Sequence, residues 1–154
     1  MTEAVFLAVL LVLATSLFHY AVLKGLSRQM TGITATTDAR ILVVLLVTML
    51  AHIVEILLYA AAYLVAVDVL QIGSFGGARI ETFLDYFYFS IVSYTSLGLG
   101  DVFPGGHLRF LTGVEALNGL LLIAWSGSFI YIAMGRCWPL SKCAEPAAMQ
   151  PGPE

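Results

Sequence analysis

The sequence predicts an all-α membrane protein with three transmembrane helices and one shorter helix that enters the membrane without crossing it. Hydrophobic residues make up 60% of the 154 residues and charged residues only 11%, far from the composition of an average soluble domain. Three long apolar segments are separated by polar or glycine-containing segments. The net charge of −3, with scattered basic residues, gives no reason to expect a nucleic-acid partner.

The first transmembrane helix is predicted over residues 1–25. Residues Val5 to Val22 are nearly all apolar and, with their flanks, can cross a hydrocarbon core ~30 Å thick. A cleaved signal peptide is the alternative, but residues 1–3 carry no basic side chain. His19 is expected to be hydrogen-bonded or interfacial, because nothing at helical spacing offers a second metal donor.

A polar cytoplasmic connector over residues 26–40 leads to the second transmembrane helix, predicted over residues 41–67. Inside this helix, His52 and Glu55 are three residues apart and share a face, with Tyr59 one turn further on. A charge at that depth costs roughly 2.5–3.5 kcal/mol. Either Glu55 is hydrogen-bonded to His52 or Tyr59 and locks the helix to its neighbours, or His52 and Glu55 form a proton-sensitive pair.

A glycine-containing loop is predicted over residues 68–79, where three glycines interrupt the helical pattern. Residues 80–95 then resume a helix that is too short to cross the membrane. Such a segment suits a re-entrant helix buried in protein, where non-helical backbone after it is tolerated. The carboxyl-terminal end of this helix would direct a partial negative charge toward a cation.

Residues 95–101 read Thr-Ser-Leu-Gly-Leu-Gly-Asp. Glycine at alternate positions, Gly98 and Gly100, admits positive φ angles that other residues resist, so successive backbone carbonyls can face one side. Rings of carbonyl oxygens replace the hydration shell of a bare cation. The pattern therefore indicates a cation site built from backbone oxygens.

The run from Asp85 to Asp101, with Pro104 and the long apolar segment after it, resembles the pore helix and selectivity filter of the potassium channel pore-domain family. Small bacterial members with three transmembrane spans look similar. The resemblance implies a homotetrameric pore in which four loops surround one axis and ions move passively, so the protein is not expected to be an enzyme. We call residues 95–101 the filter loop.

By this resemblance, potassium binds at the backbone oxygens of Ser96, Leu97, Gly98 and Leu99. The ion-binding residues implied are Thr95, Ser96, Leu97, Gly98, Leu99 and Gly100. The Ser96 hydroxyl would add an oxygen at the inner site. Asp101 would cap the outer mouth and accept a hydrogen bond from Tyr88. No cofactor other than potassium ions is expected.

Two positions depart from the common pattern of the family, which has Thr where Ser96 stands and Tyr where Leu99 stands. Ser96 keeps the hydroxyl, whereas Leu99 loses a phenol that bonds to an aromatic residue of the pore helix. Phe89 occupies that aromatic position and has no donor either, so we expect an apolar contact between Leu99 and Phe89. These departures leave a weakly selective cation channel open as an alternative.

The last transmembrane helix is predicted over residues 108–134, and the resemblance makes it the inner helix of the pore. Gly119 is the candidate gating hinge, with close helix packing as the equal alternative. Glu115 is expected to support the filter by hydrogen bonding behind the pore helix, to Ser90 or Ser93. Val92 stands where some members place a glutamate coupled to the filter.

The tail over residues 135–154 contains four prolines and little apolar content, which predicts disorder. Cys137 and Cys143 are expected to be free thiols, with palmitoylation as the alternative. The basic residues set the expected orientation, with the amino terminus outside and the carboxyl terminus in the cytoplasm. Those on the cytoplasmic side are Lys24, Arg28, Arg40, Arg136 and Lys142, and those outside are Arg79 and Arg109.

The expected partners are other copies of the chain and membrane lipids, with no small-molecule substrate evident. The absence of targeting motifs favours a bacterial inner membrane. A non-conducting scaffold or regulatory subunit with a collapsed pore is the alternative from another class. A secondary transporter is disfavoured, because the chain has one pore segment and no repeated halves.

Overall fold

The computed structural model describes residues 1–29 and 37–137. The expectations for residues 30–36, for the tail from residue 138 and for Cys143 lie outside that part of the chain. The elements follow one another in a simple order. They are α1 (Thr2–Gln29), α2 (Thr37–Leu64), a π-helical turn η1 (Val65–Val69), β1 (Phe75–Gly77), α3 (Phe83–Tyr94), β2 (Val102–Pro104) and α4 (Leu108–Cys137).

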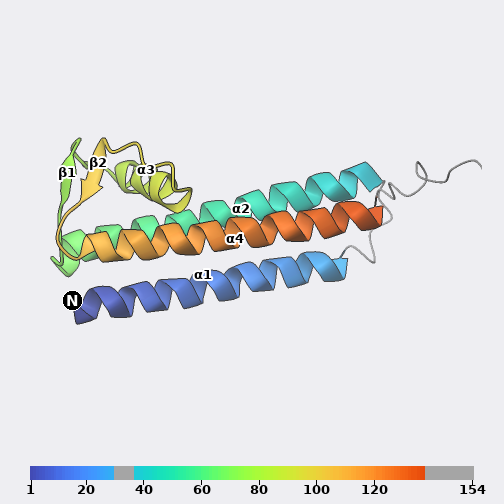
Figure 1. Cartoon of the computed structure of the whole chain (residues 1–154), viewed down its shortest axis with the longest axis horizontal. Coiled ribbons are helices and arrows are strands. Elements are labelled where there is room, and N and C mark those ends of the chain that lie inside the picture. Colours follow the sequence, from blue (N-terminus) through green and yellow to red (C-terminus); the bar gives the residue numbers. More distant parts are fainter. Residues whose placement is uncertain (30–36, 138–154) are drawn as a thin grey trace, which may run out of the picture.

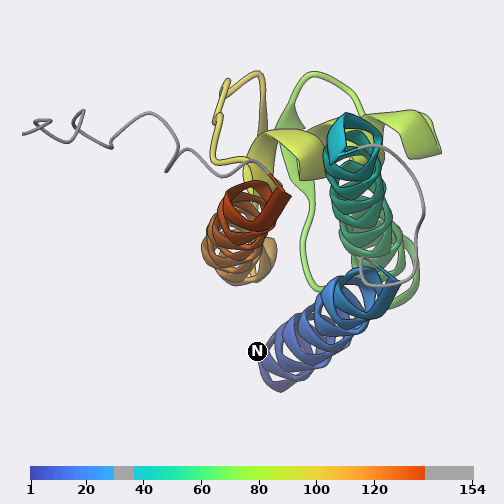
Figure 2. The ribbon, with the colours of Figure 1, turned by 90° about the vertical axis from the view of Figure 1, so that its right-hand side faces the viewer.

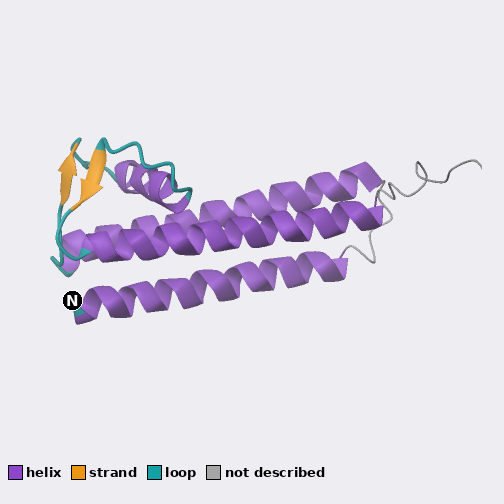
Figure 3. Cartoon of the chain, viewed as in Figure 1, coloured by secondary structure: helices purple, strands orange, loops and turns teal. Residues whose placement is uncertain are grey.

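The predicted fold class is confirmed, because three helices are long and apolar enough to span a membrane. They are α1, α2 with its continuation η1, and α4. The three run side by side, and the short helix α3 and both strands lie at one end (Figures 1 and 3). Viewed along the bundle, α3 and α1 lie on opposite sides of the pair formed by α2 and α4 (Figure 2).

The helices are longer than the sequence predicted. α1 continues to Gln29, α2 begins at Thr37, and α4 continues to Cys137. Asp38 lies in the first turn of α2. Its carboxylate interacts favourably with the positive end of the helix dipole, which helps to explain the earlier start of the helix. The polar connector is correspondingly shorter than the predicted 26–40.

The short helix α3 begins at Phe83, three residues later than predicted. The backbone N–H groups of Glu81 and Thr82 both donate to the carboxylate of Asp85, at 2.9 and 2.7 Å. These bonds cap the helix start and hold the pKa of Asp85 below its usual range. The helix therefore cannot extend back to residue 80.

The predicted loop 68–79 contains a strand that the sequence did not indicate. β1 pairs antiparallel with β2, with Phe75 opposite Pro104 and Gly76 opposite Phe103. A methyl group at Gly76 would overlap the ring of Phe103, so that ring lies directly over the glycine. Strands of three residues are too short to produce a readable alternation. This small sheet joins the segment before α3 to the segment after the filter loop.

The core near the sheet is aromatic. The ring of Phe75 lies 4.7 Å from that of Phe89 and 5.7 Å from that of Tyr63, in edge-on arrangements that aromatic rings favour. The ring of Tyr86 also lies edge-on to that of Phe75. The outer helix α2, the sheet and α3 are thereby packed into one unit beside the filter loop.

Candidate functional site

The filter loop follows α3 directly and has an alternating backbone. Ser96, Gly98 and Gly100 have positive φ angles of 57°, 59° and 79°, and the two leucines stand between them. A methyl group at Gly98 or Gly100 would meet no atom of the chain within 4 Å, so backbone conformation and not space requires glycine there. This alternation is the one expected for carbonyls that face a common side.

The inner end of the filter loop is tied to the last turn of α3. The N–H groups of Leu97 and Gly98 both donate to the carbonyl of Val92, at 2.9 and 3.3 Å, and the N–H of Ser96 donates to the carbonyl of Ser93. Backbone oxygens of the last turn of α3 therefore hold the inner end of the filter loop.

The outer end is tied by Asp101. The phenol of Tyr88 donates to the Asp101 carboxylate at 2.7 Å, and the N–H of Ala78 donates to the Asp101 carbonyl at 2.8 Å. The first bond lowers the pKa of Asp101 and raises the pKa of Tyr88. The contact expected between these two side chains is therefore present, and Asp101 links the loop to both α3 and the segment before it.

The filter loop lies on the surface of a single chain. The side chains of Leu97 and Leu99 are 62% and 58% exposed. Phe89 is buried among the aromatic side chains of the core, 5.1 Å from the ring of Tyr63. The contact expected between Leu99 and Phe89 stays a prediction. The filter loop of a single chain is thus open on the side that these leucines face.

Glu115 on α4 is fully buried and joins three helices. The hydroxyls of Tyr63 on α2 and Ser90 on α3 both donate to its carboxylate at 2.5 Å. Ser90 is also within 3.0 Å of the carbonyl of Ile56. Of the two partners expected behind α3, the structure places Ser90 on Glu115. Support of the filter by this contact stays a prediction.

Gly119 lies where α4 passes closest to the end of α3. A methyl group there would overlap the backbone oxygen and the ring of Tyr94. α4 is one helix from Leu108 to Cys137 through this position. The close-packing interpretation of Gly119 therefore has a structural basis, and its use as a hinge stays a prediction.

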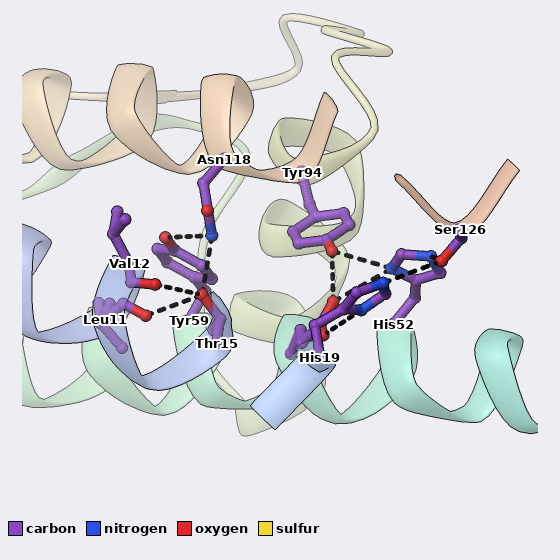
Figure 4. A network of polar contacts seen from close by, with 10 residues as sticks. Leu11, Val12, Thr15, His19, His52, Tyr59, Tyr94, Asn118 and Ser126 are labelled. Carbon is purple, nitrogen blue, oxygen red and sulfur yellow. Dashed lines mark hydrogen bonds and ion pairs between the residues drawn. The ribbon is translucent and has the colours of Figure 1, made fainter. Parts of the chain in front are cut away.

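A second buried polar group lies behind the inner end of the filter loop (Figure 4). We call it the histidine–glutamate cluster, and it contains His19, His52, Glu55, Tyr94 and Ser126. Nδ1 of His19 lies 2.8 Å from one Glu55 oxygen, and Nδ1 of His52 lies 3.1 Å from the other. Tyr94 donates to that second oxygen at 2.5 Å. The cluster draws on all four helices.

The expected contact between Glu55 and His52 is present, whereas the alternative partner Tyr59 bonds elsewhere. The amide of Asn118 donates to Tyr59 and to Thr15, at 3.1 and 2.8 Å, as Figure 4 shows. Asn118 therefore does not share the role expected for Glu115 behind α3. It holds α4 to α1 and α2.

The hydrogen bond expected for His19 is present, but sequence reasoning did not find its partner Glu55, against which His19 is fully buried. The missing donor was on another helix, and helical spacing within one segment cannot reveal it. Ligand atoms of His19, His52 and Glu55 lie within 4.8 Å of one another, a set that could hold a metal ion. A usable signal was present, because Thr15 and His19 are four residues apart on an otherwise apolar helix and so share one face.

Comparison with known proteins gives the class. Residues 51–136, more than half of the chain, match the model of a family described as "Ion channel". The chain therefore belongs to this ion channel family, the potassium channel pore-domain family that the filter loop resembles. The match runs from within α2 to the end of α4, and α1 lies outside it.

A curated relative is the inward rectifier potassium channel Kirbac3.1 of Paramagnetospirillum magnetotacticum, which is 36% identical over 86 residues. The match covers 55% of this chain and 28% of that protein, so the chain spans well under half of the relative's length. No solved structure matches the chain.

Proposed function

We propose that four copies of this chain form a passive pore for potassium ions, with one filter loop from each copy around a common axis. The observation that carries the proposal is the alternation of positive φ at Ser96, Gly98 and Gly100 in an exposed loop. Backbone oxygens in this arrangement bind a dehydrated cation. The ions would lie at Ser96, Leu97, Gly98 and Leu99, without any covalent chemistry.

The position of α3 supports a cation as the permeating ion. The helix ends at Tyr94, immediately before the filter loop. Its carboxyl-terminal carbonyls carry a partial negative charge, which stabilises a cation close to that end. Side-chain carboxylates are not needed for this attraction.

The orientation proposed is outside for the filter loop and the amino terminus, and cytoplasmic for the carboxyl terminus. The amino terminus lies at the same end of the bundle as α3 and the strands (Figure 1), as this topology requires. The excess of basic residues at the other end agrees with it. A bacterial inner membrane is the proposed location.

A weakly selective cation channel is the second candidate, favoured by Leu99. Its side chain is 58% exposed in the single chain and offers no hydrogen bond to hold the filter at a fixed width. The backbone oxygen of Leu99 remains available for an ion, so the choice between the two candidates concerns selectivity and not conduction.

The test is ion flux from purified protein in liposomes, with potassium and sodium gradients compared and barium added as a blocker. Gly98→Ala should abolish flux, because a left-handed conformation costs an L residue roughly 1–2 kcal/mol in each of four loops. Gly25→Ala is the matched control, since Gly25 on α1 has open space around it and lies far from the loop in sequence.

Potassium flux that barium blocks, that Gly98→Ala removes and that Gly25→Ala keeps is the expected result. Equal flux of sodium and potassium would instead support the weakly selective channel. An intact tetramer without flux over a range of pH would contradict conduction and favour a non-conducting scaffold.

A further inference from the structure

The histidine–glutamate cluster brings together three side chains of the kinds that bind metal ions in proteins. His19 on α1, and His52 and Glu55 on α2, each offer one ligand atom, and these atoms all lie within 4.8 Å of one another. Two imidazoles and one carboxylate are the protein ligands of several known zinc sites. Figure 4 shows the two rings next to each other, although they come from different helices.

The distances within the cluster suit a small divalent ion. Nδ1 of His19 lies 2.8 Å from one oxygen of Glu55, and Nδ1 of His52 lies 3.1 Å from the other. The ligand atoms of a tetrahedral zinc ion lie about 2 Å from the ion and therefore about 3.3 Å from one another. The two observed contacts are only a little shorter than that separation, so small side-chain movements would admit the ion.

The serine side of the cluster gives independent support for an ion on the Nδ1 atoms. Oγ of Ser126 lies 3.0 Å from Nε2 of His52 and 3.1 Å from Nε2 of His19. If each neutral ring used its one proton to reach Glu55 from Nδ1, both Nε2 atoms would be acceptors, and Ser126 has one proton for the two. An ion on the Nδ1 atoms places the ring protons on Nε2. Both rings then donate to Ser126, whose oxygen can accept twice.

Both kinds of ligand would also have the outer partners that are typical of metal sites. A histidine that binds a metal donates its other ring N–H to a neighbouring oxygen, which fixes the orientation of the ring, and a carboxylate ligand is hydrogen-bonded in turn. Ser126 would supply that oxygen for both histidines. Tyr94 donates to Glu55 at 2.5 Å. Residues of α3 and α4 are therefore in position to orient the ligands from α1 and α2.

We propose that His19, His52 and Glu55 bind one divalent transition-metal ion, for which zinc is the best match. Imidazole nitrogen suits zinc, copper, nickel and iron, whereas calcium and magnesium prefer sites built from oxygen alone. A tetrahedral ion needs a fourth ligand, which water or an anion can supply. The site differs from the filter loop in its nitrogen ligands, and it does not rest on the proposed function.

The site is enclosed on most sides and is accessible through His52. The side chains of His19 and Glu55 are fully buried, whereas that of His52 is 14% exposed. His52 and Ser126 line a groove of about 540 Å³ between α2, α3 and α4. The groove has room for the fourth ligand. Its lining is mainly apolar, so we expect the folded protein to take up the ion slowly.

The ion would link α1 to the part of the chain that matches the family. His19 lies on α1, which precedes the matched residues 51–136, whereas His52 and Glu55 lie within them. A metal ion that binds the folded chain and not the unfolded one raises stability with its concentration. We therefore expect the ion to hold α1 against α2.

The direct test is the zinc content and the thermal unfolding of the untagged full chain in detergent. Cys137 and Cys143 are replaced by serine, because thiolates also bind zinc. Zinc is supplied in one preparation during cell growth and in another after purification, since the folded protein should load slowly. We expect one zinc ion per chain and an unfolding midpoint that rises with the zinc concentration. Absence of bound zinc in both preparations would overturn the proposal.

Cobalt reports the geometry of the same site. Co²⁺ takes the place of zinc in proteins, and it absorbs visible light strongly in a four-coordinate site and weakly in a six-coordinate one. We expect strong absorption from the chain loaded with cobalt, and its loss when zinc is added. A six-coordinate spectrum would indicate an adventitious ion only, bound by water and surface groups, and would contradict the site.

Substitutions locate the ion. His19→Asn and Glu55→Gln should each lose it, and Ser126→Ala should weaken binding by about 10–100-fold, because the serine oxygen orients both rings. His107→Asn changes an exposed histidine outside the cluster and is the matched control, which should bind as the wild type does. Equal binding by His19→Asn and His107→Asn would place the ion elsewhere and show the proposal to be wrong. If the cluster variants do not fold, the zinc content and the cobalt spectrum of the chain with an intact cluster still decide.

Discussion

The filter loop is anchored at its two ends by tyrosine–carboxylate bonds that differ in their surroundings. At the outer end, Tyr88 donates to Asp101 on the exposed surface. At the inner end, Tyr94 donates to Glu55 in the interior, where both groups are nearly inaccessible. A hydrogen bond to a charged group is strong when buried and exchanges readily with water when exposed. From this difference we expect the inner anchor to contribute more to the folding stability, and the outer anchor to influence mainly the conformation of the filter loop.

The largest effect is expected at the inner anchor. Glu55→Ala leaves two histidines and a tyrosine without their buried partner, and removing one member of a buried ionic network costs ~3–5 kcal/mol. The midpoint of thermal unfolding in detergent should fall accordingly. Glu81→Ala removes an exposed carboxylate and serves as the control. If the unfolding midpoint fell equally in both variants, the buried carboxylate of Glu55 would contribute no more to stability than an exposed one.

The close packing of α4 against Tyr94 should also contribute to stability at the inner end of the filter loop. Gly119→Ala introduces a methyl group onto the backbone oxygen of Tyr94, and such overpacking costs typically ~1–3 kcal/mol. Gly113→Ala lies on the same helix with open space around it and should be neutral or stabilising. Thermal unfolding in detergent measures both. If Gly119→Ala matches Gly113→Ala, the close contact does not constrain the helix.

The smallest effect is expected at the outer anchor. Tyr88→Phe removes one exposed hydrogen bond to Asp101, so unfolding should change less than in Glu55→Ala. Its effect should instead appear in the ratio of potassium to sodium flux, because Asp101 borders the filter loop. Tyr131→Phe, on the exposed surface of α4, is the control and should alter neither quantity.

The outer anchor should also respond to pH, in the acid range. The pKa of Asp101 is lowered by the hydrogen bond from Tyr88, so the ionised carboxylate stabilises the folded loop. This contribution is complete above the ordinary pKa of aspartate, about 4, and is lost as pH falls through the lowered value. Asp101 should therefore stay ionised around neutral pH, and small pH changes in that range should not alter flux through this group. In Tyr88→Phe the acid transition should move upward, and an unchanged transition would rule out this anchor.

The parts of the fold that depend on local sequence were predictable. The positive φ angles at the alternate glycines follow from a short run of residues, and the three spanning helices follow from long apolar segments. The contact of Tyr88 with Asp101 was expected from the family resemblance. The late start of α3 was also readable, since Thr82 and Asp85 have the spacing of a helix cap. It was missed because the apolar pattern extends further back.

The contacts between helices were harder to predict. Glu55 meets His19 from a residue 36 positions away, and Asn118 meets Thr15 from 103 positions away. These pairings depend on how α1 packs against α2 and α4, and the apolar pattern of a membrane helix does not fix that rotation. The strands were missed for another reason, because their pairing depends on the return of the chain after the filter loop.

The most direct test of the central claim is the reversal potential of purified protein in a planar bilayer, with potassium on one side and sodium on the other. If the filter loop selects potassium, the current reverses close to the potassium equilibrium potential, and Gly98→Ala removes the current. Reversal at zero voltage would show that the loop conducts without selecting. An intact tetramer that carries no current in either direction would contradict the account of the filter loop as a pore.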